Sequence, residues 1–285
     1  TMFLIFFLAA ISVAAVSVLE KTIVRKRKIS LGLYQCSSFL AIVLLMLPLL
    51  YFFWEVNPSA LTTKNIIIFS LVVIFSVAAN LLSFYSLKWE KITHIEPARL
   101  LEPLFVVSLA IIFSFIFGEL MFERNTKVIL PALIASCALI FSHIKKHHLR
   151  FNKYLIAAIL GSFFFALELV TSRLILNLYS PITFYFLRCA MIFLISFIIF
   201  RPKFNKLDKK VKLEILLIVA IAIAYRILIY YGYLSLGVIY TTLMVMLGPV
   251  FVYIFAWKFL KEKIEWRKIM AAVIILGSVL YVLLA

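Results

Sequence analysis

The chain has 285 residues, of which 66% are hydrophobic and only 14% charged, and its mean hydropathy is +1.15. Soluble domains are close to half apolar and about a quarter charged, so a globular fold has too little interior to hide this much apolar surface. The composition therefore excludes an ordinary soluble domain and predicts an integral membrane protein, in which the net charge of +17 must belong to the connections between helices.

Ten apolar segments follow one another along the chain, most of them close to the 20 or so residues that a transmembrane helix needs. Strands of a membrane barrel would be about ten residues long and alternate in polarity. The segments therefore predict an all-α membrane protein with ten transmembrane helices, and the first of them lacks the flanking pattern of a cleaved signal peptide. They cover residues 2–20, 31–54, 65–87, 93–118, 126–143, 153–177, 181–200, 213–235, 238–260 and 267–285.

Basic residues are distributed unevenly between the connections. Of the 29 lysines and arginines, 22 lie in the odd-numbered connections and 4 in or beside the even-numbered ones. Because basic loops are retained in the cytoplasm, this bias predicts cytoplasmic odd connections, outside termini and a place in the cell membrane. The same distribution argues against nucleic acid as a partner.

An internal repeat is visible in the fourth and ninth segments. Residues 102–106, Glu-Pro-Leu-Phe-Val, are echoed by residues 248–252, Gly-Pro-Val-Phe-Val, and an acidic residue, Glu119 or Glu262, follows each motif. A unit of five helices is odd-numbered, so a second copy must enter the membrane upside down relative to the first. We therefore expect two inverted five-helix repeats, residues 1–147 and 148–285.

This arrangement resembles the drug/metabolite transporter superfamily, and within it the EamA-type carriers of ten helices. The step Ser180-Pro181 with Arg188 downstream, and Pro249 with Glu262 after it, carry the resemblance together with the two five-helix units. The resemblance covers essentially the whole chain and implies a carrier of small molecules. Its members move amino acids, drugs, nucleotide-linked compounds, sugars and other metabolites, so the substrate stays open.

Three ionisable residues lie deep in predicted helices of the second unit. At a rise of 1.5 Å per residue, Glu168, Arg188 and Arg226 lie about 13, 10 and 15 Å from the nearest connection on one side. Charges at this depth are costly and mark functional sites. Glu168 can neutralise one arginine and leave a positive charge for a substrate carboxylate or phosphate; a purely structural network that locks the helices is the alternative.

Further polar and aromatic residues extend this candidate site. Tyr230 lies one helical turn after Arg226, and a face lined by tyrosine and arginine suits an organic ligand with a flat or charged part. In the first unit, a buried Glu102 could bind a proton during a transport cycle, although His94 and Glu96 are expected to be solvated near the membrane surface. The predicted substrate-binding residues are Glu168, Arg188, Arg226, Tyr230, Tyr225, Asn80, Arg99 and Glu102.

Other chemistry finds little support in the sequence. A phosphate-binding glycine loop, a nucleophile elbow and a metalloprotease motif are all missing, so we predict no enzyme and no cofactor. Neighbouring lysines disfavour a metal ion at His147 and His148. The scattered Cys36, Cys137 and Cys189 are predicted to be buried thiols.

The sequence thus predicts a monomeric secondary transporter that exports or exchanges small metabolites, with amino-acid-like or other polar organic solutes favoured. Alternating access around a central cavity is the expected mechanism, and protons are the candidate coupling ion. Two alternatives stay open: a transporter of cationic drugs or lipids, which would need an acidic residue not cancelled by arginine, and a membrane scaffold without transport activity.

Overall fold

The structure, a computed structural model, describes residues 29–90, 92–118, 125–143, 152–250 and 265–284. These ranges are almost entirely helical, and one isolated antiparallel bridge joins Val56 to Tyr179. The α-helices are α2 (Leu31–Phe53), α3 (Thr63–Trp89), α4 (Ile92–Arg99), α5 (Glu102–Ile116), α6 (Thr126–His143), α7 (Lys153–Arg173), α8 (Pro181–Phe200), α9 (Lys209–Ser235), α10 (Val238–Val245) and α12 (Trp266–Leu284). Short 3-10 helices are η2 (Pro58–Leu61), η3 (Leu176–Leu178) and η4 (Phe204–Lys206).

Within the described ranges, seven helices are long and apolar enough to cross a membrane: α2, α3, Pro97–Ile116, α7, α8, α9 and α12. Thr126–Ser142 and Val238–Val250 are shorter apolar helices. The prediction of a helical, multi-pass membrane protein is therefore confirmed. The first predicted segment, the end of the ninth, and the acidic residues Glu119 and Glu262 lie outside the described residues, so the count of ten helices stays a prediction.

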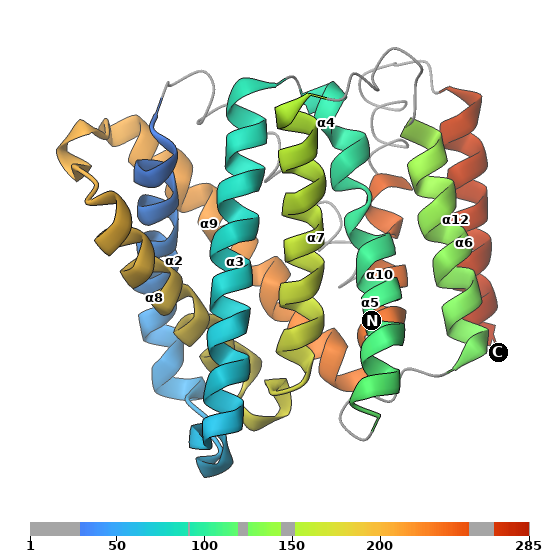
Figure 1. The fold of residues 1–285 in the computed structure, drawn as a ribbon, viewed down its shortest axis with the longest axis horizontal. Coiled ribbons are helices and arrows are strands. Elements are labelled where there is room, and N and C mark those ends of the chain that lie inside the picture. Colours follow the sequence, from blue (N-terminus) through green and yellow to red (C-terminus); the bar gives the residue numbers. More distant parts are fainter. Residues whose placement is uncertain (1–28, 91, 119–124, 144–151, 251–264, 285) are drawn as a thin grey trace.

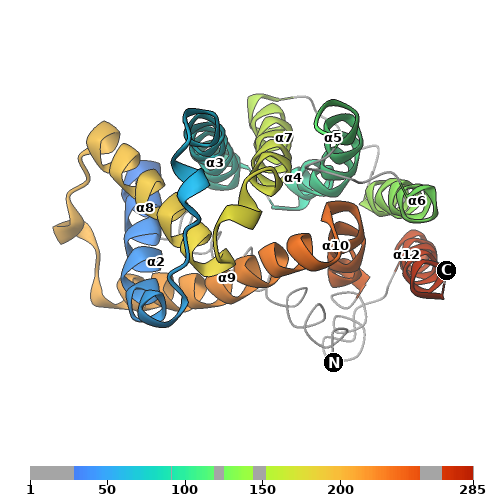
Figure 2. The ribbon, with the colours of Figure 1, turned by 90° about the horizontal axis from the view of Figure 1, so that it is seen from below.

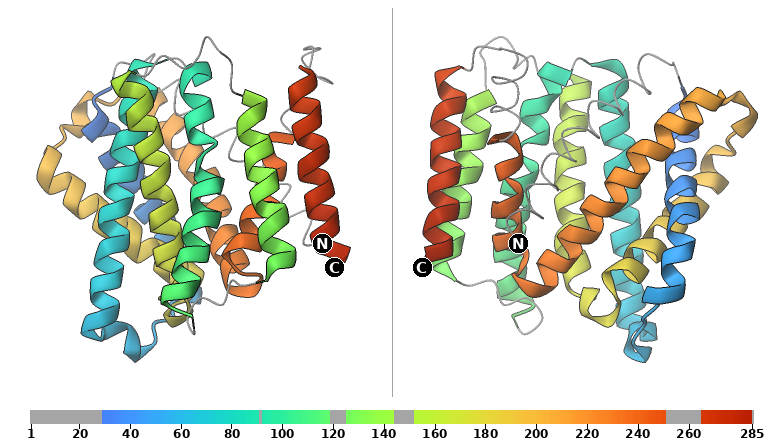
Figure 3. Two further views of the ribbon diagram at one scale, coloured as in Figure 1. Left: turned by 45° about the vertical axis from the view of Figure 1, so that its right-hand side comes forward. Right: turned by 180° about the vertical axis from the view of Figure 1, so that it is seen from behind.

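The helices stand side by side in a broad bundle (Figure 1). The closest pairs are α3 with α7, α6 with α12, and α2 with α8. The pair α6–α12 forms one edge of the molecule, and α9 runs obliquely from the α2–α8 edge to α10 (Figures 2 and 3). Helices that are distant in sequence therefore meet in the middle of the bundle.

Two helices are interrupted close to the prolines of the repeated motif. Between α4 and α5 the chain turns at Leu100 and Leu101, just before Pro103, and a turn at Met246 follows α10 just before Pro249. Proline has no N–H to give to the carbonyl four residues earlier, and its ring presses against that turn. The predicted segments 93–118 and 238–260 are thus each interrupted beside a proline of the repeated motif.

The described connections divide by charge between the two ends of the bundle (Figure 1). The turn after α3 and the basic link from Arg201 to Asp208 lie at the same end as the start of α12, where Arg267 and Lys268 are found. We call this end the basic face. The links α2–α3, α7–α8 and α9–α10 lie at the opposite end, as the alternation of connections requires.

Small residues allow close helix contacts, as expected for membrane helices. A Cβ atom on Gly161 of α7 would lie 3.3 Å from the backbone nitrogen of Ser83 on α3, and one on Gly232 would lie 2.6 Å from Thr241 Cγ2. Gly237 adopts a positive φ of 88° at the turn into α10, which a residue with a side chain would adopt only with strain.

The prediction for the cysteines is correct in two cases and wrong in the third. Cys36 and Cys189 are buried, whereas Cys137 is exposed on α6. The error arises because an apolar neighbourhood in sequence does not by itself indicate burial. In a membrane helix the apolar face is also the outer face, since lipid takes the place of water.

Candidate functional site

The centre of the candidate site is the carboxylate of Glu168 on α7, whose side chain is completely buried. Ser172, one turn later on the same helix, donates its hydroxyl to Glu168 Oε1 at 3.2 Å and to the Glu168 backbone carbonyl at 2.7 Å. A carboxylate this far from water needs several donors to be tolerated. One of these donors therefore comes from its own helix.

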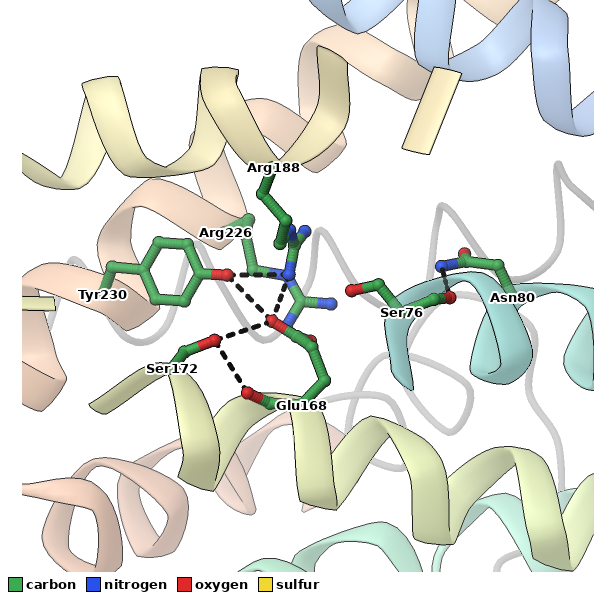
Figure 4. Close-up of polar contacts among 7 residues, drawn as sticks. All are labelled: Ser76, Asn80, Glu168, Ser172, Arg188, Arg226 and Tyr230. Atoms are coloured by element: carbon green, nitrogen blue, oxygen red, sulfur yellow. Dashed lines mark hydrogen bonds and ion pairs between the residues drawn. The ribbon is translucent and has the colours of Figure 1, made fainter. Parts of the chain in front are cut away.

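Arg188 and Tyr230 bring two more helices to this carboxylate. Arg188 Nη1 on α8 forms an ion pair with Glu168 Oε1 and donates to the Tyr230 hydroxyl oxygen at 2.7 Å. The Tyr230 hydroxyl, from α9, donates in turn to Glu168 Oε1 at 3.0 Å. Three side chains from three helices thus close one hydrogen-bonded ring, shown in Figure 4.

Arg226 supplies a second guanidinium to the same carboxylate. Its Nη1 lies 3.4 Å from Glu168 Oε2, and its side chain is 16% exposed against 4% for Arg188. Because Tyr230 follows Arg226 by one turn of α9, both reach the same carboxylate. Arg226 therefore forms the accessible edge of the cluster, whereas Arg188 is enclosed.

Aromatic rings pack against the cluster on the side of α8 and form an aromatic wall there. The Arg188 guanidinium lies 4.9 Å from the ring centroid of Tyr185 and 5.7 Å from that of Tyr230. Phe184 packs edge-on against Tyr230, with ring centroids 5.3 Å apart. Cations are attracted to ring faces at these distances, so the aromatic wall holds Arg188 in place.

The site carries more positive than negative charge. Glu168 faces both Arg188 and Arg226, and Glu102 at the start of α5 lies within Coulombic range of Arg226 and of Arg99. Two carboxylates therefore share three guanidiniums. In addition, Arg188 Nε is buried with no hydrogen-bond partner among the described residues.

The structure thus brings together most of the predicted site. Glu168, Arg188, Arg226 and Tyr230 are in direct contact, as expected for one layer of charges. The sequence predicts Tyr225 in the second unit, and Arg99 and Glu102 in the first. In the structure these two groups meet, because Glu102 lies within Coulombic range of Tyr225, Arg226 and Arg99.

Asn80 is less directly involved. Its amide donates to the Ser76 carbonyl of its own helix at 2.7 Å. Figure 4 shows Asn80 and Ser76 on α3 at the side of the cluster, with the Ser76 hydroxyl facing the arginines. Sequence reasoning missed Ser76, Ser172 and Tyr185, although helical spacing pointed to two of them, since Ser172 follows Glu168 by four residues and Tyr185 precedes Arg188 by three.

A second polar contact between distant parts of the chain lies at the end opposite the basic face. Ser180 Oγ and Thr183 Oγ1, at the start of α8, lie 2.6 and 2.9 Å from the Phe53 carbonyl at the end of α2. The Glu55 N–H donates to Thr183 Oγ1 at 3.1 Å. Backbone hydrogen bonds from Asn57 to Leu178 and from Ser180 to Glu55 extend the contact, which we call the loop clasp.

Comparison with known proteins adds a match to a family model. Residues 152–284 match the model of the EamA-like transporter family. The predicted resemblance to the drug/metabolite transporter superfamily is therefore confirmed over residues 152–284, which contain Glu168, Arg188 and Arg226. Curated proteins give no match to the sequence.

A solved crystal structure, described only as that of a protein, shares the fold. The match covers 99% of this chain and 96% of the other chain, with a TM-score of 0.70 at 15% sequence identity. At this identity the likeness concerns the fold alone. Together with the apolar helices, the family match indicates a membrane transporter of small solutes, and the matched family consists of transporters rather than enzymes.

Proposed function

We propose that the protein is a secondary transporter that carries small polar organic solutes with an anionic group, amino-acid-like solutes among them, by alternating access around the Glu168–Arg188–Arg226 cluster. The observation that carries this proposal is the sharing of one buried carboxylate by two guanidiniums. A buried charge without a full partner costs several kcal/mol. A solute carboxylate placed against Arg226 would supply the missing negative charge.

The geometry favours Arg226 as the contact for the solute. Arg188 is enclosed by Tyr185, Tyr230 and Glu168, whereas Arg226 is partly exposed and makes the longer contact, at 3.4 Å. Guanidinium groups bind carboxylates through two parallel hydrogen bonds. Arg188 would therefore hold Glu168 and Tyr230 in position, and Arg226 would be the group that exchanges partners.

Several features support two inverted repeats, residues 1–147 and 148–285, as the scaffold for this exchange. Ser30 and Ser180 cap α2 and α8 with nearly identical backbone angles, and each accepts a hydrogen bond from the N–H three residues later. The helices that the repeat would relate also pack in pairs: α2 with α8, α5 with α10, and α6 with α12. Inverted repeats that rock about a central site are a common transporter design.

The loop clasp suggests how one side of such a site would be closed. It joins the α2–α3 link to the α7–α8 link across the proposed repeat boundary, at the end away from the basic face. If the basic connections are cytoplasmic, the clasp lies on the outer, non-cytoplasmic side of the membrane. The structure would then represent a carrier shut toward the outside, with the termini also outside.

The alternative of a cationic-drug carrier is less well supported. It needs an accessible acidic residue not cancelled by arginine, and Glu102 was the candidate. Glu102 lies within Coulombic range of both Arg226 and Arg99, so it is not a carboxylate free of arginine. The proposal keeps Glu102 as the group that would bind a coupling proton.

The test is transport by purified protein in liposomes, with a panel of amino acids, other carboxylates and organic cations. Arg226→Gln should lower the flux of the accepted anionic or zwitterionic solute by about tenfold or more, because a charge-assisted hydrogen bond contributes about 1.5–3 kcal/mol. Ser172→Ala is the matched control, since it removes a donor from the same carboxylate without changing any charge. Transport confined to organic cations, or equal flux in both variants, would refute the proposal.

A further inference from the structure

A groove lies between α6 and α12, away from the charge cluster. These two helices form an edge of the bundle (Figure 2). Its volume is about 390 Å³, and most of its lining is apolar. Sites for small molecules have volumes of about 300–1,000 Å³. The lining residues are Ala138, Phe141, Ser142, Trp266, Arg267, Met270, Ala271 and Ile274.

The groove opens toward lipid rather than toward water. Phe141 on α6 and Met270 on α12 line it and are 71% and 53% exposed, and Ile134 and Val273 on the same two helices are 48% and 62% exposed. Both helices are apolar, so these side chains face acyl chains when the protein is in a bilayer.

Charge is concentrated at one end of the groove. Among the eight lining residues the charged one is Arg267, in the first turn of α12 at the basic face, where its guanidinium lies 5.9 Å from the Trp266 ring centroid. Tryptophan and arginine are typical of the headgroup level. From Arg267 to Ile274 is seven residues, or about 10 Å of helix, so the groove runs from headgroup depth into the hydrocarbon.

From this combination of an apolar slot and a basic end, we propose that the α6–α12 groove binds an anionic phospholipid of the leaflet at the basic face. One acyl chain lies along Ala138, Met270 and Ile274, and the phosphate lies against Arg267. Basic pockets between transmembrane helices on the cytoplasmic side bind anionic headgroups in this way. Lys268, which follows Arg267 on α12, adds a further positive charge at the same end.

Such a lipid would be a structural partner of the α6–α12 edge and not a solute of the transport site. It would fill the groove between two helices that otherwise contact each other closely, and would thereby stabilise their pairing. The proposal is independent of which solute the protein carries.

Lipid binding to the purified protein, measured by native mass spectrometry with phosphatidylglycerol and phosphatidylcholine, tests this inference. Arg267→Gln should weaken retention of phosphatidylglycerol about fivefold, in line with about 1 kcal/mol for one basic residue near a charged headgroup, and should leave phosphatidylcholine unchanged. Ala138→Leu, which fills the groove, should weaken retention of both lipids.

Two matched controls separate the groove from the general surface. Lys203→Gln removes an exposed charge at the basic face outside the groove, and Val273→Leu enlarges an exposed side chain of α12 that does not line it; both should bind lipid as the unaltered protein does. Equal retention of phosphatidylglycerol in all four variants would overturn the proposal. Loss of a dimer in Arg267→Gln and Ala138→Leu would also overturn it, because a second copy would then occupy the groove.

Discussion

Glu168 is the residue on which the charge cluster depends, because it is the common partner of Arg188, Arg226 and Tyr230. Glu168→Gln leaves two guanidiniums without their counter-charge, and removing one partner of a buried ion pair costs about 3–5 kcal/mol. We therefore expect this variant to unfold at a clearly lower temperature in detergent. Ser172→Ala, which removes one neutral donor, should cost about 1 kcal/mol. Similar melting temperatures for the two variants would show that the charges are not coupled.

Gly232 offers a second prediction at this scale. A Cβ atom there would lie 2.6 Å from Thr241 Cγ2, whereas a Cβ atom on Gly277 would meet nothing within 4 Å. Gly232→Ala should therefore destabilise the protein by about 1–3 kcal/mol through overpacking. Gly277→Ala serves as the control and should be neutral or slightly stabilising, because alanine favours a helix. Thermal unfolding of both variants tests this prediction. An unchanged melting temperature for Gly232→Ala would mean that α9 and α10 separate easily.

At the residue scale, sequence alone located the ionisable members of the site but not their neighbours. Glu168, Arg188 and Arg226 stand out because charge is rare in apolar segments. Ser172, Tyr185 and Ser76 do not, because hydroxyl and aromatic groups are common in membrane helices. Ser172 and Tyr185 lie on the same helices as Glu168 and Arg188, so only helical spacing could have indicated them. The position of Ser76 depends on which helices meet, and that is decided by packing rather than by local sequence.

Among the elements, the loop clasp is the contact most easily tested. Ser180→Ala together with Thr183→Val removes both hydroxyls that donate hydrogen bonds to the Phe53 carbonyl. The backbone hydrogen bonds between the links remain. If the clasp closes one side of the carrier, its loss should raise the fraction of molecules open on that side. The expected result is a severalfold faster reaction of a cysteine placed at Tyr225 with a polar maleimide added from that side.

One control variant and one contradicting outcome complete this test. Ser59→Ala removes a hydroxyl that, among the described residues, bonds to Asn57 within the α2–α3 link, and it should leave the labelling rate unchanged. A double variant of Ser180 and Thr183 with an unaltered rate would show that the clasp is a static link and not a gate.

The predicted segments 93–118 and 238–260 are continuous, whereas the structure interrupts both of them beside a proline, whose effect on a helix is local. Pro103 and Pro249 each lie within three residues of a break. The boundaries were less accurate at α3 and α9, which extend two to four residues beyond the predicted segments to include polar residues such as Lys64 and Lys210. Hydropathy finds the part of a helix that is in lipid, whereas hydrogen bonding carries the helix further into the headgroup region.

For the whole molecule, orientation is the open question that charge can answer. The basic face should be cytoplasmic. After replacement of the exposed Cys137 by Ser, single cysteines at Lys203 and at Lys64, both exposed and at opposite ends, would be treated in intact cells with an impermeant maleimide. Lys64→Cys should react and Lys203→Cys should react only after lysis. The reverse pattern would invert the assignment and place the loop clasp on the cytoplasmic side.

The central claim is that the solute reaches the charge cluster from each side of the membrane in turn. Tyr225 precedes Arg226 on α9, and a cysteine at Tyr225 can be labelled in inside-out and right-side-out vesicles, with Val219→Cys, 2% exposed on the same helix, as the buried control. We expect Tyr225→Cys to react from both sides and to be protected by the transported solute. Labelling from neither side, or labelling that the solute does not change, would contradict a carrier built around this cluster.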